Sequence, residues 1–250
     1  MTLRSLELFA GIGGLSLGLE RAGLCRPAAF CEINPFARSV LKKQWPGVAQ
    51  FEDVRTLNAD ALDARGIGGI NLIAAGFPCQ PFSAAGNQLG EADDRHLWPH
   101  VERLAGELQP RWIVAENVPR LLTIDRGRTF GRILAGLGAL GYDAEWECVP
   151  ASAFGYPHRR DRLFLVAYAQ GLRRHQGIWA AQGADRYDSV LGRGPGGFGD
   201  QKYPEDQSGV ARMADGLPDQ LDRNHALGNA VVPAVAQWIG ECILAAEGAA

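Results

Sequence analysis

The stretch Leu6-Glu7-Leu8-Phe9-Ala10-Gly11-Ile12-Gly13-Gly14 joins a short apolar run to a turn rich in glycine. Residues 15–22 follow with the apolar spacing of a helix that buries one side. Glycines between a strand and a helix let the backbone approach a ligand closely at the N-terminus of the helix. The stretch therefore predicts a strand, a ligand-binding turn and a helix in direct succession.

An acidic residue follows the next apolar run and completes this pattern. Glu32 stands 21 residues after Gly11 and directly after residues 28–31, which are expected to form a buried strand. Nucleotide-binding folds place an acid there to bind the hydroxyl groups of a ribose. The turn and Glu32 together indicate a cofactor that contains adenosine, and NAD and S-adenosylmethionine both satisfy them at this point.

Apolar runs and helical patterns alternate through the first two thirds of the chain. Buried strands are expected at residues 6–10, 28–31, 70–75 and 112–115, and helices at residues 15–22, 35–44 and 97–108. Such alternation predicts an α/β fold with an open, doubly wound, mostly parallel sheet whose ligands bind at the carboxyl ends of its strands. Residues 142–149 and 162–168 have no obvious helix between them, which predicts an antiparallel pair at one edge.

The composition changes at residue 171. Residues 171–222 are dominated by Gly, Asp, Gln and Arg, and a segment of about 50 residues exceeds ordinary loop lengths. We expect an irregular insertion with a function of its own. Residues 231–246 become helical again, with Pro233 near the first turn, where a missing N–H costs little. This last helix is expected to return to the core of a domain formed by residues 1–170 and 223–250.

Composition argues against several classes of protein. Of the 250 residues, 46% are hydrophobic, and no apolar run approaches the roughly 18–20 residues that a membrane-spanning helix needs. The start of the chain lacks the pattern of a secretion signal. Five cysteines without CxxC or Cys/His spacing indicate neither a disulfide framework nor a structural zinc site. A cytoplasmic protein without a metal is therefore expected.

The net charge is −3, but the charged residues are unevenly distributed along the chain. Residues 111–174 contain ten arginines and six acidic residues, whereas the rest of the chain is acidic. Arg presents a planar fork that suits phosphates and base edges, so this segment indicates an anionic partner. A solvated face with internal ion pairs would have the same composition, and charge alone favours that interpretation.

The sequence Gly-Phe-Pro-Cys-Gln-Pro-Phe-Ser at residues 76–83 follows the strand expected at residues 70–75. Pro78 and Pro81 fix the backbone on either side of Cys79 at the exit of a central strand, where active sites of this architecture collect. Such a mount predicts that Cys79 is a nucleophile. The remaining cysteines are expected to be buried and inert, and they are Cys25, Cys31, Cys148 and Cys242.

Three further groups stand near expected element ends. Glu116 follows residues 112–115, and burial there would hold its carboxyl protonated and able to donate a proton. In residues 158–162, the alternation of an extended chain predicts that Arg160 and Arg162 face one way. Residues 228–233 open the last helix, which is another place for close backbone approach to a ligand.

These motifs, in this order, resemble the cytosine-5 DNA methyltransferase family. The resemblance rests on Phe-Ala-Gly-Ile-Gly-Gly at residues 9–14, Pro-Cys-Gln-Pro-Phe-Ser at 78–83 and Gly-Asn-Ala-Val at 228–231. It implies the seven-stranded sheet of S-adenosylmethionine-dependent methyltransferases. Residues 1–170 and 223–250 would be the catalytic and cofactor-binding domain, and residues 171–222 a short target-recognition region.

The resemblance also implies a mechanism. Cys79 would add to carbon 6 of cytosine, Glu116 would bond or protonate ring nitrogen 3, and Arg162 would bind the ring carbonyl. Arg160 would order the pocket. Carbon 5 would then accept the methyl group of S-adenosylmethionine, on a base flipped out of double-stranded DNA.

Further roles follow from the same resemblance. The expected cofactor-binding residues are Phe9, Gly11, Ile12, Gly13, Gly14, Glu32, Asp53, Val54, Gly76, Pro78, Leu97, Asn229, Ala230 and Val231. The expected substrate-binding residues are Gln80, Ser83, Asn117, His158, Arg173 and Arg174. A compact bacterial or phage enzyme is implied, monomeric and with a cognate restriction endonuclease as a partner.

Three alternatives stay open from the sequence. A transfer-RNA cytosine methyltransferase would use the same scaffold. A catalytically idle module that binds cofactor and DNA would need loss of the nucleophile, against which the intact Cys79, Glu116 and Arg162 argue. An NAD oxidoreductase would explain the glycines and Glu32 but would leave the Pro-Cys segment without a role.

Overall fold

The computed structural model describes residues 2–78, 97–156, 160–171, 177–179 and 230–248. Within these residues one seven-stranded sheet has the order β3-β2-β1-β4-β5-β7-β6. The strands are β1 (Leu3–Leu8), β2 (Cys25–Cys31), β3 (Ala49–Phe51), β4 (Leu72–Gly76), β5 (Trp112–Asn117), β6 (Tyr142–Pro150) and β7 (Asp161–Ala169). The helices are α1 (Gly14–Arg21), α2 (Pro35–Gln44), α3 (Ala59–Asp63), α4 (Trp98–Leu108), α5 (Arg128–Ala139) and α8 (Pro233–Gly248), with 3₁₀ turns η2 (Pro119–Leu122), η3 (Ile124–Gly127) and η4 (Ala151–Phe154).

Strand direction matches the prediction of a mostly parallel sheet. Strands β1 to β5 pair in parallel, and β7 pairs antiparallel with both β5 and β6. The antiparallel pair predicted from residues 142–149 and 162–168 is therefore confirmed, with β6 at the edge of the sheet.

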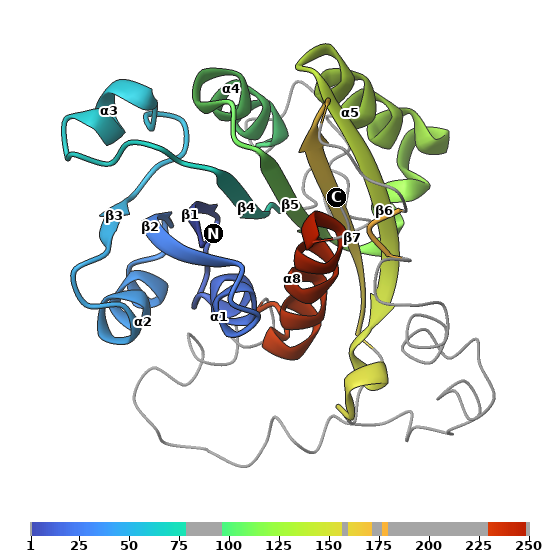
Figure 1. Ribbon diagram of the computed structural model, residues 1–250, viewed down its shortest axis with the longest axis horizontal. Coiled ribbons are helices and arrows are strands. Elements are labelled where there is room, and N and C mark those ends of the chain that lie inside the picture. Colours follow the sequence, from blue (N-terminus) through green and yellow to red (C-terminus); the bar gives the residue numbers. More distant parts are fainter. Residues whose placement is uncertain (1, 79–96, 157–159, 172–176, 180–229, 249–250) are drawn as a thin grey trace.

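Helices cover both faces of the sheet, as Figure 1 shows, with α1, α2 and α8 on one side and α3, α4 and α5 on the other. Successive strand residues point to opposite faces, so one strand serves two cores. In β4, Ile73 and Ala75 belong to the cluster that includes α4 and α5, whereas Leu72 and Ala74 belong to the cluster with α1 and α8. The central strands are thus buried on both faces, which is why β4 and β5 are nearly continuous apolar runs.

The last helix packs directly on the first. A Cβ atom on Gly14 would overlap the carbonyl oxygen of Val231, and one on Gly18 would overlap Ala236. A Cβ on Gly240 would lie 2.7 Å from that of Ala22. Glycine at these three positions lets the two helices meet, and the prediction that the last helix returns to the core is confirmed.

Three elements have no counterpart in the sequence prediction. β3 is three residues long and half-buried, and α3 is five residues long. Neither is long enough to show a clear period of apolar residues in the sequence. Helix α5 contains three glycines and no side-chain cap at its start. It is held by burial of Phe130, Ile133 and Leu137 on the sheet, which outweighs weak helix propensity.

Candidate functional site

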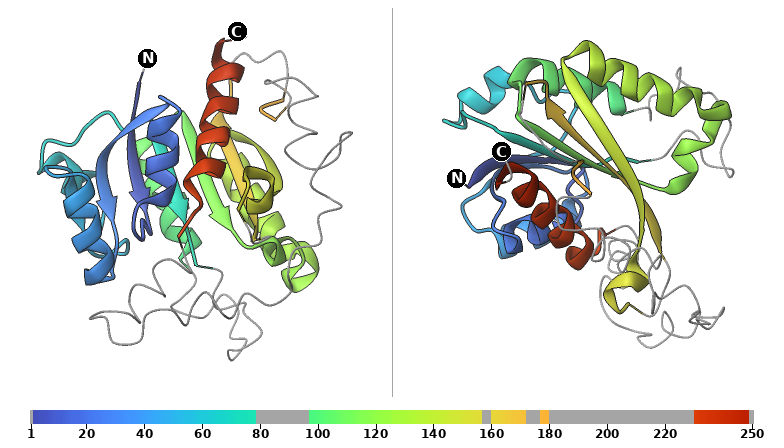
Figure 2. Two further views of the ribbon diagram at one scale, coloured as in Figure 1. Left: turned by 90° about the horizontal axis from the view of Figure 1, so that it is seen from below. Right: turned by 45° about the vertical axis from the view of Figure 1, so that its right-hand side comes forward.

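The ends of four parallel strands converge at one edge of the sheet, the lower edge in the left view of Figure 2. The glycine turn follows β1, Glu32 follows β2, Gly76 ends β4, and Glu116 is the last residue but one of β5. A Cβ on Gly76 would lie 3.7 Å from the carbonyl oxygen of Phe9 and 3.8 Å from Oε2 of Glu116. Segments far apart in the sequence therefore meet around Gly76.

Glu32 fixes the glycine turn. Its Oε2 accepts a hydrogen bond from the backbone N–H of Gly11 (2.7 Å), and its Oε1 accepts one from Asn34 (2.8 Å). Phe9, Gly11 and Gly13 all have left-handed backbones, with φ of 56°, 54° and 83°. No atom lies within 4 Å of a Cβ built on Gly11, so the turn leaves open space there.

The start of α1 has no side-chain cap, so its first N–H groups are available to an acceptor. One of them, from Ser16, donates to Oε2 of Glu7 at 3.1 Å. Glu7 lies within β1 and is 2% exposed, and burial raises its pKa to about 8. A carboxyl that is mostly neutral at pH 7 therefore accepts a hydrogen bond from the first turn of α1. The sequence had not indicated this role.

The expected adenine side of the cofactor site lies along β2 and β3. The N–H of Glu32 donates to the carbonyl of Phe51 (3.0 Å), which brings the segment after β3 next to that acid. There Asp53 is bound by Nε of Arg55 at 2.9 Å, and this hydrogen bond lowers the pKa of the carboxyl. Ile33 is 64% exposed beside the turn. An open cradle at Gly11, an acid with spare lone pairs and an exposed apolar side chain fit an adenosine group.

Other expected cofactor residues are placed around this cradle. Val54 is buried, Leu97 is half-buried just before α4, and Pro78 is exposed at the end of the described segment after β4. Beside Gly14 the room for a side chain is taken by the carbonyl of Val231, and Gly13 lies against the ring of Trp45. Among Gly11, Gly13 and Gly14, it is Gly11 that faces open space.

Buried Glu116 and half-buried Arg162 form an ion pair at the end of β5. Arg162 Nε lies 2.9 Å from Oε1 of Glu116, which is 7% exposed. Burial raises the pKa of Glu116, and the charges of Arg162 and Arg160 oppose this rise. The carboxyl thus keeps a proton to a higher pH than an exposed glutamic acid does, as its position in the sequence suggested.

Arg160 connects this pair to the last segment of the chain. Its Nη2 donates to the carbonyl of Ala230 at 2.7 Å. β7 begins at Asp161, and Arg160 has a left-handed backbone with φ of 36°. The predicted extended alternation is therefore wrong at Arg160, although both arginines still act on Glu116 electrostatically.

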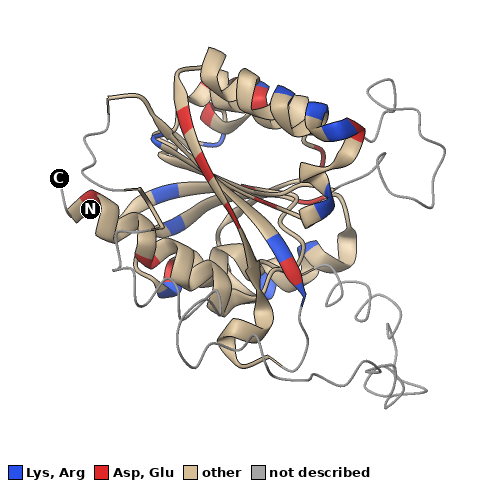
Figure 3. Cartoon of the chain, turned by 90° about the vertical axis from the view of Figure 1, so that its right-hand side faces the viewer, with Lys and Arg blue, Asp and Glu red and all other residues tan. Residues whose placement is uncertain are grey.

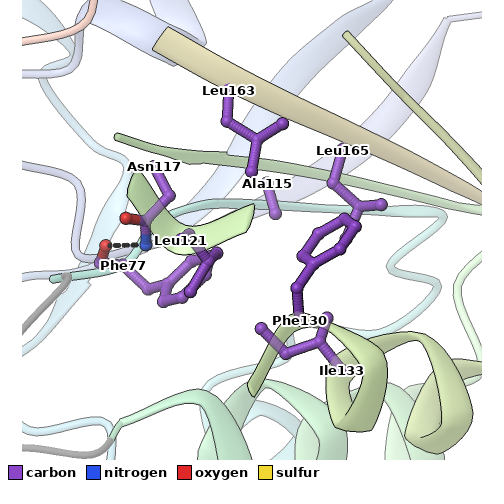
Figure 4. Close-up of a pocket in the computed structure, with 8 residues that line it drawn as sticks. All are labelled: Phe77, Ala115, Asn117, Leu121, Phe130, Ile133, Leu163 and Leu165. Carbon is purple, nitrogen blue, oxygen red and sulfur yellow. Dashed lines mark hydrogen bonds between the residues drawn. The ribbon is translucent and has the colours of Figure 1, made fainter. Parts of the chain in front are cut away.

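Asn117 holds the start of the Pro-Cys segment. Its Nδ2 donates to the carbonyl of Phe77 (3.0 Å), and its Oδ1 accepts from the N–H of Val118 (2.8 Å). Figure 4 shows this bond between two of the residues that line an apolar pocket. The pocket is lined by Phe77, Ala115, Asn117, Leu121, Phe130, Ile133, Leu163 and Leu165.

Seven predicted site residues lie outside the part of the chain that the structure describes. They are Cys79, Gln80, Ser83, His158, Arg173, Arg174 and Asn229. The other cysteines are free thiols, and Cys25, Cys31 and Cys242 are buried while Cys148 is half-buried. Burial raises the pKa of Cys25 and of Cys31 to about 12, which is typical of buried thiols that do not react.

Two residues at the site were not singled out by the sequence. Glu7 is an acid between two buried leucines of β1, a pattern that could have indicated a buried carboxyl with a role at the site. Arg55 has no such signal, because its contact with Asp53 depends on the turn after β3. Within the described ranges, no three His, Cys, Asp or Glu side chains gather as metal ligands, and no helix is long and apolar enough to cross a membrane.

Comparison with known families gives one match over most of the chain. The model of the C-5 cytosine-specific DNA methylase family matches residues 3–207. A Type II methyltransferase of Neisseria gonorrhoeae, M.NgoMIV, is 40% identical over 168 residues, which are 67% of this chain and 52% of that protein. The Bacillus subtilis Type II methyltransferase M2.BsuMI is 36% identical over 170 residues, 66% of this chain and 42% of its own. The chain thus spans about half the length of these relatives.

Solved structures agree with the sequence matches. A putative DNA modification methyltransferase encoded within an Escherichia coli prophage has a TM-score of 0.61 and 31% identity, over 70% of this chain and 49% of that one. The Dnmt2 methyltransferase of S. pombe has a TM-score of 0.55 and 25% identity, over 67% and 51% of the two chains. The arrangement of strands and helices is therefore one that methyltransferases share.

Proposed function

Because this chain belongs to the C-5 cytosine-specific DNA methylase family, we propose that it transfers a methyl group from S-adenosylmethionine to carbon 5 of a cytosine in double-stranded DNA. The ion pair of Glu116 and Arg162, at the same sheet edge as the open turn at Gly11, is the observation that supports this most directly. A group able to hold a proton on the base stands beside the place where the methyl donor would bind.

Cys79 is the nucleophile of this proposal. Carbon 5 of cytosine is a weak nucleophile, so the Cys79 thiolate adds to carbon 6 and moves electron density to carbon 5. Carbon 5 takes the methyl group, which S-adenosylmethionine supplies when bound. Loss of the carbon-5 proton to a base then returns the electron pair to the ring and expels the thiolate.

Glu116 and the two arginines stabilise the base during this addition. Attack at carbon 6 places negative charge on the ring, and a protonated Glu116 offsets it by a hydrogen bond or proton at nitrogen 3. Arg162 is held within 2.9 Å of that carboxyl and binds the ring carbonyl. Arg160, bonded to Ala230, keeps the last segment of the chain against the same pocket.

The residues near the glycine turn hold the cofactor. The Glu32 carboxylate already accepts two backbone N–H groups and has lone pairs left for ribose hydroxyls. Ile33 would cover one face of the adenine. Asp53 and Val54 follow β3 on the adenine side, and the segment around Asn229, Ala230 and Val231 would close the other side.

The remaining parts of the proposal concern the partner. The target cytosine must leave the base stack to reach a thiolate and a methyl donor on its two sides. Residues 171–222 would form the target-recognition region, and residues 1–170 with 223–250 the catalytic domain. The names of the Type II relatives support a role beside a cognate restriction endonuclease, with this enzyme acting as a monomer.

The test is a covalent trap. A fluorine at carbon 5 cannot leave as a proton does, so a duplex with 5-fluorocytosine should accumulate an adduct with the protein in the presence of S-adenosylmethionine. Bisulfite sequencing of DNA from cells that express the protein should show methylated cytosines. Cys79→Ser should lose both results and keep its affinity for S-adenosylhomocysteine.

A buried cysteine serves as the matched control. Cys242 is fully buried in α8, so Cys242→Ser should still trap fluorocytosine if the protein folds. Methylation by Cys79→Ser at the wild-type rate would refute the mechanism. Methyl transfer to transfer RNA and not to the duplex would refute the assigned substrate while leaving the chemistry intact.

A further inference from the structure

The connection from β5 to the end of α5 carries an excess of positive charge. Residues 118–139 contain four arginines and one acidic residue, Asp125. All four arginines are exposed, and we call them the arginine surface: Arg120, Arg126, Arg128 and Arg132. We propose that the arginine surface binds the phosphate backbone of the DNA duplex next to the target base. This inference rests on the proposed function, because it takes duplex DNA as the substrate.

One member of the surface is fixed beside the site. Turn η2 follows Asn117 directly, and its Leu121 is 2% exposed in the pocket of Figure 4, together with Phe77 and Asn117. Arg120 precedes Leu121 and is exposed. The burial of Leu121 therefore anchors η2, and exposed Arg120 is held close in the chain to Asn117 and Glu116.

Helix α5 carries two further members on the side that faces away from this pocket. Its Phe130 and Ile133 line the pocket of Figure 4. Arg128 and Arg132 are four residues apart, so they share one side of the helix, and both are exposed. Figure 3 shows Lys and Arg gathered where α5 begins, on the side of the molecule where β7 also begins.

The turn before α5 has a strained backbone, and its Ile124 is half-buried against the core. Asp125, Arg126 and Gly127 have φ of 51°, 58° and 83°, so three successive residues are left-handed. None of the side chains in η3 is buried. The Asp125 carboxylate is occupied by Arg128, which leaves Arg126 without an ion pair among the described residues. Strain of this kind persists where function requires it, and here it presents Arg126 beside Arg128.

Phosphate is the anion that this arrangement suits. A flipped base stays covalently joined to its strand, so the neighbouring phosphates must lie close to the end of β5, where Glu116 stands and from which turn η2 continues. Guanidinium groups bind phosphate oxygens through two N–H bonds and position the duplex without reading its sequence. The surface thus orients the DNA, and other parts of the protein select the site.

The experiment compares two double variants of equal charge change. In Arg120→Gln/Arg126→Gln, the slope of log affinity for the duplex against log salt concentration should fall by about 2, since each lost phosphate contact removes about one unit. KM for DNA should rise while kcat at saturating DNA stays near wild type. Lys42→Gln/Lys43→Gln changes two exposed residues of α2 and should leave slope and KM unchanged.

A charge-conserving variant separates binding from folding. Arg120→Lys/Arg126→Lys should keep the wild-type salt slope, and all three variants should bind S-adenosylhomocysteine as the wild type does. A wild-type slope in Arg120→Gln/Arg126→Gln, or an equal loss in the α2 variant, would overturn the arginine surface while the proposed function stands. A wild type that does not bind the duplex at all would overturn both.

Discussion

At the scale of single residues, the site depends on what burial does to two carboxyl groups. Glu116 is paired with Arg162 but still has a raised pKa, because its desolvation outweighs the nearby positive charges. Glu32 is also buried, yet each of its oxygens accepts a backbone N–H. One acid is thus prepared to carry a proton, and the other to accept hydrogen bonds.

The pH dependence of the reaction tests Glu116. If its protonated form acts on the base, the rate of methyl transfer should fall as the pH rises through the raised pKa of Glu116. Glu116→Gln keeps the shape but cannot transfer a proton, so its rate should drop by about 100-fold or more. The residual rate of this variant should lose the alkaline decline, as single-turnover assays across pH would measure. If the rate of Glu116→Gln still fell at alkaline pH as the wild-type rate does, the fall would be due to another titrating group.

At the scale of elements, the contact between α1 and α8 joins the two ends of the described chain. The glycines at this contact have no room for a side chain, so the distance between the helices is set by backbone contact. The same contact holds Val231 against Gly14, at the start of α1. Packing of the last helix therefore also shapes the proposed cofactor site.

A pair of glycine substitutions separates packing from helix propensity. Gly18→Ala places a methyl group into Ala236 and Pro233, and overpacking of this kind costs about 1–3 kcal/mol of unfolding free energy. Gly131→Ala in α5 meets no atom within 4 Å and should stabilise the protein by up to about 1 kcal/mol. Urea titration of both variants measures the difference. Equal stabilities would show that α1 and α8 do not pack this closely.

At the scale of the whole molecule, distant segments are joined through the sheet. Glu247, near the end of α8, accepts a hydrogen bond from Trp112 Nε1 at 2.9 Å and lies 3.0 Å from Arg111 Nη2. Ile178 and Trp179 are buried in the cluster that includes α8, and the N–H of Ile178 donates to Glu145. Residues 177–179, which follow the composition change at residue 171, are thus attached to the core on the α8 side of the sheet.

The free energy of unfolding should depend on pH in a way that reflects the raised pKa of Glu7. Its pKa of about 8 lies above the value of an unfolded glutamic acid, so the folded state binds more protons from about pH 5 to pH 8. The stability that this group contributes is present at low pH and is lost as the pH rises, on the order of 1 kcal/mol per pH unit. Glu7→Gln should not show this loss. Denaturant titrations at several pH values measure the unfolding free energy of both proteins. If it changed with pH in the same way in wild type and Glu7→Gln, the raised pKa of Glu7 would be contradicted.

The sequence by itself determined the type of most elements and the order in which they meet the site. Apolar runs report strands and amphipathic spacing reports helices, because both depend on a local period. Parallel strands then end at one edge, so the residues at or just after the ends of β1, β2, β4 and β5 could be expected together. For this reason Gly11, Glu32, Gly76 and Glu116 were identified from the sequence alone.

Only the tertiary structure decided which of these groups touch and how they are charged. The bond from Arg160 to Ala230 spans 70 residues, and that from Asn117 to Phe77 spans 40, and no local period encodes either. The buried state of Glu7 follows from α1 covering β1, and α5 forms because the sheet buries its apolar side. Desolvation and long-range contact arise from packing of the whole chain, which a local pattern cannot report.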